Sequence, residues 1–211
     1  EIKQITYQSG AERSPVISPN GKLIAFSFEE RRPLAYTRDQ IAIMDVNGNN
    51  IRLLTEDLDG DADNLMWSSD NKSLFYTYDE RGIRKIGQVT MKGKLNEIAN
   101  GLGGTTLGRP YLSGGFHAVN NTIAYTHGTY ERPANVAVVN EGQIQILTAL
   151  NEDLLGHRKL GAVNEITYES SFDGQEIQGW YITPPDFDPS KKYPLILEIH
   201  GGPHLAYGPY F

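Results

Sequence analysis

The sequence has 211 residues, of which 39% are hydrophobic and 21% charged, as in a folded protein with a sizeable core. Its net charge of −7 and its lack of any lysine-arginine block argue against a nucleic-acid partner, and the absence of cysteine excludes disulfides, thiolate metal sites and a cysteine nucleophile. No apolar run approaches the length of a membrane span and no signal peptide opens the sequence, so we expect a cytoplasmic protein with no membrane partner.

A repeat of about fifty residues runs through the first 148 residues. The stretch ISPNGKLIAF at 17–26 matches WSSDNKSLFY at 67–76, and HAVNNTIAYTHG at 117–128 is a weaker third copy. Each copy places a polar turn before an apolar strand. A second element repeats in step, because residue pairs that favour tight turns lie between alternating strands. These predicted hairpin turns are Asn47-Gly48, Lys92-Gly93 and Glu141-Gly142.

Several short strands in each period of this length are typical of the blades of a β-propeller. We predict three blades of about four antiparallel strands, at 7–55, 56–99 and 100–148, without helix between Ser14 and Thr148. The opening EIKQIT resembles NIRLLT at 50–55, so it is expected to be the last strand of a further copy. Since three blades cannot close a ring, we expect residues 1–148 to be part of a larger propeller.

After Thr148 the pattern changes. Residues 149–163 are expected to form a connector with one helical turn, and residues 164–185 a two-stranded hairpin around Phe172-Asp173-Gly174. The run PLILEIH at 194–200 is nearly all apolar, which predicts a strand buried on both faces of a mixed or parallel sheet. It leads into His-Gly-Gly-Pro, so residues 164–211 are expected to begin a second domain.

The stretch ITYESSFDGQEIQGWYITPPDFDPSKKYPLILEIHGGPHLAYGPYF resembles the interdomain junction of the prolyl oligopeptidase family of serine peptidases, above all its acylaminoacyl-peptidase-like branch. The turns SPNGK and SSDNK resemble the degenerate propeller repeats of that family. The resemblance implies a mostly-β chain, in which a partial β-propeller is followed by the first strands of an α/β-hydrolase domain. It also implies that the whole protein hydrolyses short or N-acylated peptides by nucleophilic acyl transfer, with the propeller restricting access to the site.

The resemblance assigns the second glycine of His-Gly-Gly-Pro, Gly202, to the oxyanion hole, where a backbone N–H stabilises developing negative charge. Gly201 and His204 are expected to line the substrate site beside it. The alternative is that these glycines and Pro203 form only a turn that ends a strand. His200 is not expected to act as a catalytic base, because a hydrolase triad runs Ser, Asp, His along the chain.

The sequence contains no GxSxG nucleophile elbow, since YLSGG at 111–115 lacks the first glycine. We therefore expect all three triad residues to lie outside these 211 residues, so that this fragment alone is inactive. No cofactor or metal is expected.

Two stretches have the composition of other binding sites. GLGGTTLG at 101–108 lacks the Lys-Ser/Thr of a P-loop and is expected to connect two blades. DLDGDADN at 57–64 has alternating aspartates, but its glycine is fourth rather than sixth and Ser68 stands where a calcium loop has glutamate. An acidic solvated loop is therefore favoured over a structural calcium site. Trp67 and Trp180 are expected to pack in a core or an interface.

The alternative function is that of a non-enzymatic β-propeller module that binds a partner protein. A buried strand ending in His-Gly-Gly-Pro disfavours this alternative, because a binding propeller has no need of it. Open sheet edges and the apolar run at 194–200 predict that the fragment associates with itself or with the rest of its parent protein.

Overall fold

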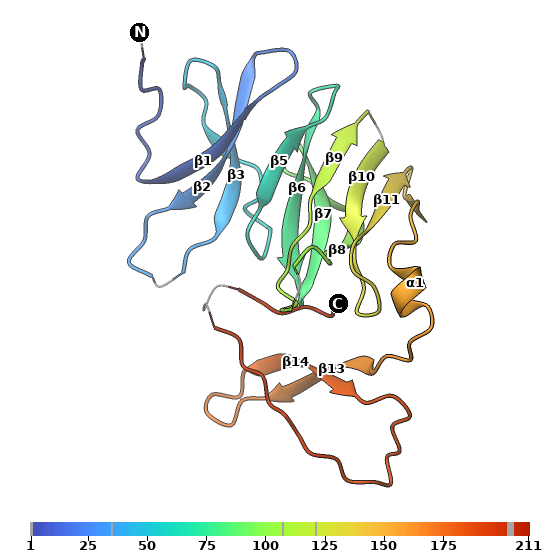
Figure 1. Cartoon of the computed structure of the whole chain (residues 1–211). Helices are drawn as coiled ribbons and strands as arrows, with labels where there is room; N and C mark the ends of the chain where they lie inside the picture. Colours follow the sequence, from blue (N-terminus) through green and yellow to red (C-terminus); the bar gives the residue numbers. More distant parts are fainter. Residues whose placement is uncertain (1, 35, 107, 121, 202–204) are drawn as a thin grey trace.

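The chain is described by a computed structural model that covers residues 2–34, 36–106, 108–120, 122–201 and 205–211. Strands dominate it, and a four-residue helix, α1 (Glu152–Leu155), follows the last of three successive groups of strands (Figure 1). The predictions of a mostly-β chain and of no helix between Ser14 and Thr148 are thus confirmed for the residues that the structure describes. Within the same residues, no helix is long and apolar enough to cross a membrane.

The first group of strands forms one antiparallel sheet in chain order. Its strands are β1 (Gly10–Ile17), β2 (Leu23–Glu30), β3 (Asp39–Asp45) and β4 (Arg52–Leu53). The predicted turn joins β3 to β4, and Gly48 there has a φ of 88°, a conformation that favours glycine. The carboxylate of Asp45 stabilises this turn by accepting bonds from the backbone N–H groups of Asn47 (2.9 Å) and Asn49 (3.0 Å).

The second and third groups share one larger sheet. The second comprises β5 (Asp63–Trp67), β6 (Ser73–Glu80), β7 (Ile83–Thr90) and β8 (Leu95–Leu102). The third comprises β9 (Phe116–Val119), β10 (Thr122–His127), β11 (Asn135–Asn140) and β12 (Gln143–Ile146). A single antiparallel pair, Leu102 with His127, joins β8 to β10, whereas the neighbours within each group pair over several residues. Each group is therefore a blade-like unit, and the chain is a partial propeller.

The sequence repeat is visible in matching side-chain bonds. Ser18 donates from Oγ to Asn20 Oδ1 (2.8 Å), and Ser68, fifty positions later, donates from Oγ to Asp70 Oδ1 (2.7 Å). Each acceptor also binds the backbone N–H two residues further on, so the same polar turn precedes β2 and β6.

Apolar cores lie between neighbouring groups of strands. The core between the first two groups includes Ile41, Ile43, Trp67, Leu74, Tyr76 and Val89. The core between the second and third groups includes Phe75, Ile86, Leu102, Ile123, Tyr125 and Val139. Burying each large apolar side chain stabilises the fold by about 1.5–3 kcal/mol, so these two layers hold the groups side by side.

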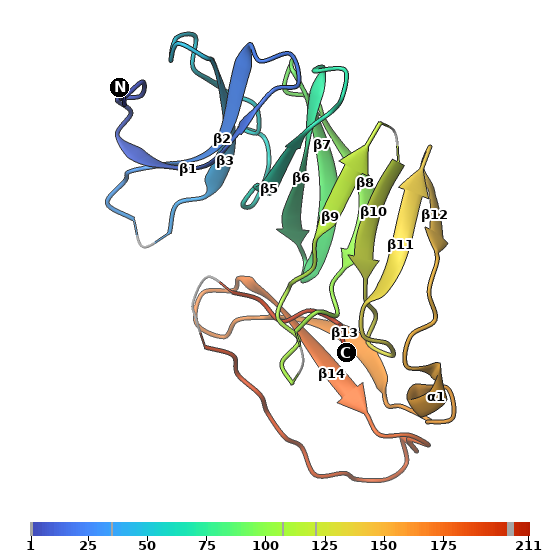
Figure 2. The ribbon, with the colours of Figure 1, turned by 45° about the horizontal axis from the view of Figure 1, so that its top comes forward.

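A separate hairpin lies at one end of the propeller strands (Figure 2). It pairs β13 (Ala162–Glu169) with β14 (Glu176–Thr183) in antiparallel register, as predicted. The turn between them closes through a bond from the Ser170 N–H to the Gln175 carbonyl (2.8 Å), and Gly174 there has a φ of 71°.

Two predicted strands are absent from the described part of the chain. Residues 194–200 form no strand and leave Leu195 and Ile196 about 90% exposed, because no described strand lies beside them to complete a sheet. Residues 2–6 also form no strand, although Ile5 packs against the core formed by Phe26, Ala42 and Met44. An apolar run gives the propensity for a strand, but a strand forms only where a partner offers its backbone groups.

Candidate functional site

The predicted site residues lie near the end of the chain. Gly202 and His204 fall outside the described residues, as does Pro203. Gly201 is described and exposed, with open space where a Cβ would stand, and its carbonyl oxygen lies 3.1 Å from His200 Nδ1. The ring of His200 packs on the ring of Tyr207, with 5.0 Å between their centroids. These contacts of His200 are local, and the expectation that it is not a catalytic base stays a prediction.

The segment 205–211, hereafter the docking segment, lies against the ends of the propeller strands. Tyr207 forms an isolated antiparallel bridge with Tyr111, and the Leu112 N–H donates to the Ala206 carbonyl (3.4 Å). The Gly208 N–H donates to the Pro110 carbonyl (3.0 Å). These backbone bonds fix the docking segment along residues 110–112, which lie between β8 and β9.

Aromatic and polar side chains hold the middle of the docking segment. The rings of Tyr111 and Tyr207 meet edge to face, with centroids 4.7 Å apart and an interplanar angle of 72°. Arg109 donates from Nη1 to the Tyr207 hydroxyl (3.3 Å). From the hairpin, Trp180 Nε1 donates to the Tyr207 carbonyl (3.3 Å), so the expected role of Trp180 in an interface is confirmed.

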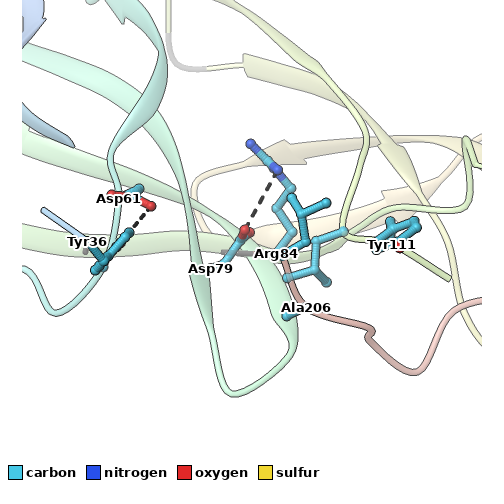
Figure 3. Close-up of a pocket in the computed structure, with 9 residues that line it drawn as sticks. Tyr36, Asp61, Asp79, Arg84, Tyr111 and Ala206 are labelled. Carbon is cyan, nitrogen blue, oxygen red and sulfur yellow. Dashed lines mark hydrogen bonds and ion pairs between the residues drawn. The ribbon is translucent and has the colours of Figure 1, made fainter. Parts of the chain in front are cut away.

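A cavity of about 210 Å³ opens between the docking segment and the propeller strands (Figure 3). Leu205 and Ala206 form one wall, and the other residues come from loops and strand ends of the propeller. Those other lining residues are Tyr36, Gly60, Asp61, Asp79, Arg84, Tyr111 and Leu112. We take this cavity as the candidate functional site, because it is where the segment following Gly202 meets the rest of the chain.

The guanidinium of Arg84 is the central charged group of the cavity. The Arg84 side chain, at the start of β7, is 15% exposed and lies 3.8 Å from a carboxylate oxygen of Asp79 (Figure 3). It also lies 3.6 Å from a carboxylate oxygen of Asp63. Arg84 also donates from Nη2 to Thr77 Oγ1 (3.0 Å). Burial raises the pKa of Asp79, and the Arg84 charge offsets only part of that effect.

A second acidic group lies on the same side of the cavity. Asp61 accepts a bond from the Tyr36 hydroxyl (2.7 Å) and another from the Asp39 N–H (2.7 Å). Burial, reinforced by the bond to Asp61, raises the pKa of Tyr36 well above its usual value. The phenol therefore stays protonated and acts as a donor near neutral pH.

The arrangement suits binding better than bond cleavage. Carboxylates outnumber the guanidinium, so the cavity favours a cationic group or hydrogen-bond donors of a peptide. Among the described residues that line it, none is a serine, cysteine or threonine that could act as a nucleophile. The acidic loop 57–64 contributes Asp61 to the cavity lining, and the described residues contain no cluster of three or more ligands that could hold a metal ion.

The sequence indicates only part of this lining. The composition of 57–64 indicates an acidic loop, and the described residues after Leu102 do lie between β8 and β9. Gly101 and Leu102, however, end β8, so the connector begins two residues later than predicted. Asp79 and Arg84 flank a charged hairpin turn that resembles any solvated turn in sequence. Their approach to Leu205 and Ala206 depends on contacts across more than a hundred residues, which no local pattern reveals.

The known proteins that this chain resembles in sequence include several named as peptidases. No family model matches the chain. Dipeptidyl-peptidase 5 of Porphyromonas gingivalis is 27% identical over 197 residues, covering 92% of this chain and 28% of that protein. The probable dipeptidyl-peptidase 5 of Aspergillus niger is 28% identical over 207 residues, covering 94% of this chain and 27% of that protein. This chain therefore spans little more than a quarter of the length of these relatives.

A solved structure shares the fold. The acylaminoacyl peptidase of Pyrococcus horikoshii superposes with a TM-score of 0.71 at 24% identity, over 90% of this chain and 28% of that one. Because the match extends over most of the described chain, it includes most of the propeller strands described above.

Proposed function

We infer that this chain, a relative of the prolyl oligopeptidase-family peptidases, is the part of a serine peptidase in which the propeller meets the peptidase domain. The observation that carries this inference is the 27% identity to a dipeptidyl-peptidase 5 across 92% of the chain, which exceeds the length of the propeller part. A module that served only to bind a partner protein would have no reason to extend this likeness beyond the propeller strands to the hairpin.

The proposed reaction of the whole protein is hydrolysis of short or N-acylated peptides near their N-terminus. The names of the relatives, dipeptidyl-peptidase and acylaminoacyl peptidase, support substrates of this size. A serine hydroxyl would attack the scissile carbonyl while a histidine takes its proton, and the amine would then leave with that proton. Water would hydrolyse the resulting acyl-enzyme. We propose that the serine, acid and histidine are supplied from outside residues 1–211.

Within this scheme the backbone N–H of Gly202 is proposed to stabilise the oxyanion, with Gly201 and His204 beside the substrate. This assignment rests on the resemblance of His-Gly-Gly-Pro to the family loop and on the requirement for close backbone approach, which glycine permits. The cavity beside Leu205 and Ala206 is proposed to receive part of the peptide. Its small volume, about 210 Å³ between the strand ends and the docking segment, supports a propeller that restricts access to short substrates. We further propose a cytoplasmic location.

The test uses two proteins, the full-length gene product that contains this chain and the 211-residue chain alone. Each is treated with a fluorophosphonate probe that labels active serine hydrolases, and each is assayed on a dipeptidyl nitroanilide and an acetyl-amino-acid nitroanilide. We expect labelling and nitroaniline release from the full-length protein alone. A full-length protein that is not labelled and that hydrolyses neither substrate would overturn the proposed peptidase function.

A further inference from the structure

The ring of Tyr210 occupies a socket on the propeller. Tyr210 is 8% exposed, and its hydroxyl oxygen accepts a bond from the Arg84 N–H (3.2 Å). Next to it, the Phe211 N–H donates to the Thr129 carbonyl (2.9 Å). The ring therefore inserts between the start of β7 and the loop that follows β10, although it belongs to a segment with no strand or helix of its own.

Two glycines make room for this ring. A Cβ on Gly103 would lie 2.2 Å from Tyr210 Cε1, and a Cβ on Gly208 would lie 2.7 Å from Tyr210 Cε2. Neither glycine has the positive φ that would require glycine for conformational reasons. The space taken by the ring is thus the physical reason for glycine at position 103, since a side chain there would displace Tyr210. A Cβ on Gly208 would also lie 2.3 Å from the Gly82 carbonyl oxygen, so that glycine accommodates the β6–β7 turn as well as the ring.

The docking segment and the hairpin meet on one turn. Gly82, in the turn between β6 and β7, has the Trp180 ring and the Tyr207 carbonyl close to where its Cβ would stand, both at 3.2 Å. Its neighbour Arg81 pairs with Glu165 (2.8 Å) and Glu176 (3.3 Å) on the hairpin. The turn is therefore enclosed by the hairpin and by the docking segment.

We propose that Tyr210 is a positioning residue that fixes the wall of the cavity formed by Leu205 and Ala206, and so sets which peptides the cavity admits. Four residues lie between Leu205 and Tyr210, and the bonds from Leu112 to Ala206 and from Gly208 to Pro110 hold this stretch against the propeller. With the ring seated, this wall stands opposite Arg84 and Asp79. Without it, the docking segment loses its one large buried side chain, and the wall can move away from the strand ends.

This inference rests on the proposed function, because it assumes that the cavity receives part of a peptide substrate. The experiment uses the full-length protein and compares Tyr210→Ala, Tyr210→Phe, Gly103→Ala and the double variant Gly103→Ala with Tyr210→Ala. The matched control is Gly115→Ala, because Gly115 is exposed and has open space at its Cβ position. Amide hydrogen exchange of Leu112, Gly208 and Phe211 is measured together with kcat and KM on dipeptidyl and tetrapeptidyl nitroanilides.

We expect Tyr210→Ala to raise exchange at these three amides and to raise KM for the dipeptide about tenfold, while kcat changes less than threefold. The preference for the dipeptide over the tetrapeptide should fall by a similar factor. Tyr210→Phe, which keeps the ring, should stay within about threefold of wild type. Gly103→Ala should behave like Tyr210→Ala, and the double variant should be no worse than Tyr210→Ala, since the added methyl has no ring left to displace.

If Tyr210→Ala shows the same amide exchange and the same KM as the wild-type protein, the inference is overturned. The proposed peptidase function is not affected by that result. If Tyr210→Ala does not fold, Gly103→Ala supplies the same measurement. A wild-type protein without any peptidase activity would overturn the proposed function and the substrate-selecting role with it. In that case exchange at Leu112 and Phe211 still decides whether Tyr210 holds the docking segment.

Discussion

Trp67 and Val16 join the first two groups of strands through one hydrogen bond, in which the indole Nε1 of Trp67 donates to the Val16 carbonyl 3.0 Å away. Trp67 is 8% exposed and lies in the core between the two sheets. Trp67→Phe keeps an aromatic ring but leaves the carbonyl unpaired, so we expect the free energy of unfolding to fall by about 1–3 kcal/mol. Urea denaturation measures this loss. Phe172→Ala, at a residue that is 95% exposed, should leave the urea midpoint unchanged.

Gly87 lies against the ring of a fully buried tyrosine. A Cβ at Gly87 would stand 2.4 Å from Tyr76 Cζ, so Gly87→Ala must push that ring within a packed core. We expect a loss of about 1–3 kcal/mol in the free energy of unfolding. The comparison is Gly179→Ala, where the nearest atom would be an Ile166 methyl group at 3.5 Å. Equal thermal midpoints for the two variants would contradict the packing described here.

His127 predicts a pH dependence of stability. Burial lowers the pKa of this imidazole in the folded chain, whereas in the unfolded chain it titrates near about 6.5. As the pH falls through about 6.5, the unfolded chain takes up a proton that the folded chain resists, so stability decreases until the folded-state pKa is passed. We expect His127→Gln to flatten the change in urea midpoint between about pH 7.5 and pH 5.5. A change in urea midpoint as large in His127→Gln as in the wild type would contradict this expectation.

Gly202 is the residue on which the proposed chemistry depends most. In the full-length protein, Gly202→Val should crowd the substrate carbonyl and displace the N–H, lowering kcat by about a hundred- to a thousandfold. The thermal midpoint should change little. Near-normal turnover on an acyl-amino-acid nitroanilide would favour the plain-turn alternative, and Gly115→Ala again provides the control for an added side chain.

The apolar run at 194–200 predicts association of the isolated chain. Leu195, Ile196, Leu197 and Ile199 are 76–90% exposed, and such a patch promotes contact between copies. We expect light scattering to show oligomers that Leu195→Lys combined with Leu197→Lys converts largely to monomer. Phe172→Lys, which changes an exposed apolar residue on the hairpin turn, should leave the oligomers intact. A monomeric wild-type chain at high concentration would contradict this expectation.

Local sequence signals predicted the propeller strands because the relevant interactions are themselves local. The turns at Asn47-Gly48, Lys92-Gly93 and Glu141-Gly142 fall where predicted, and each of their glycines has a positive φ. The hairpin around Asp173-Gly174 follows the same rule. Alternating strands joined by such turns leave little choice of register.

The cavity could not be predicted in this way. Arg84 and Ala206 are far apart in the sequence, and their proximity depends on how the docking segment returns to the propeller. The strand expected at 194–200 shows that a local pattern can also predict an element that does not form. Its apolar residues satisfy every local criterion, yet strand formation also needs a neighbouring backbone, which no local pattern specifies.

The turn at Arg81 and Gly82 has a consequence for engineering this chain. Hairpin tips are ordinarily the best places to insert a tag or a fluorescent label, because they project into solvent. Glu141-Gly142 fits that rule, with both residues exposed and open space around Gly142. The tip at Arg81-Gly82 is an exception, because the indole of Trp180 and the carbonyl of Tyr207 leave no room there for added chain. Reporter groups therefore belong at the β11–β12 tip, whereas the β6–β7 tip should be left at its native length.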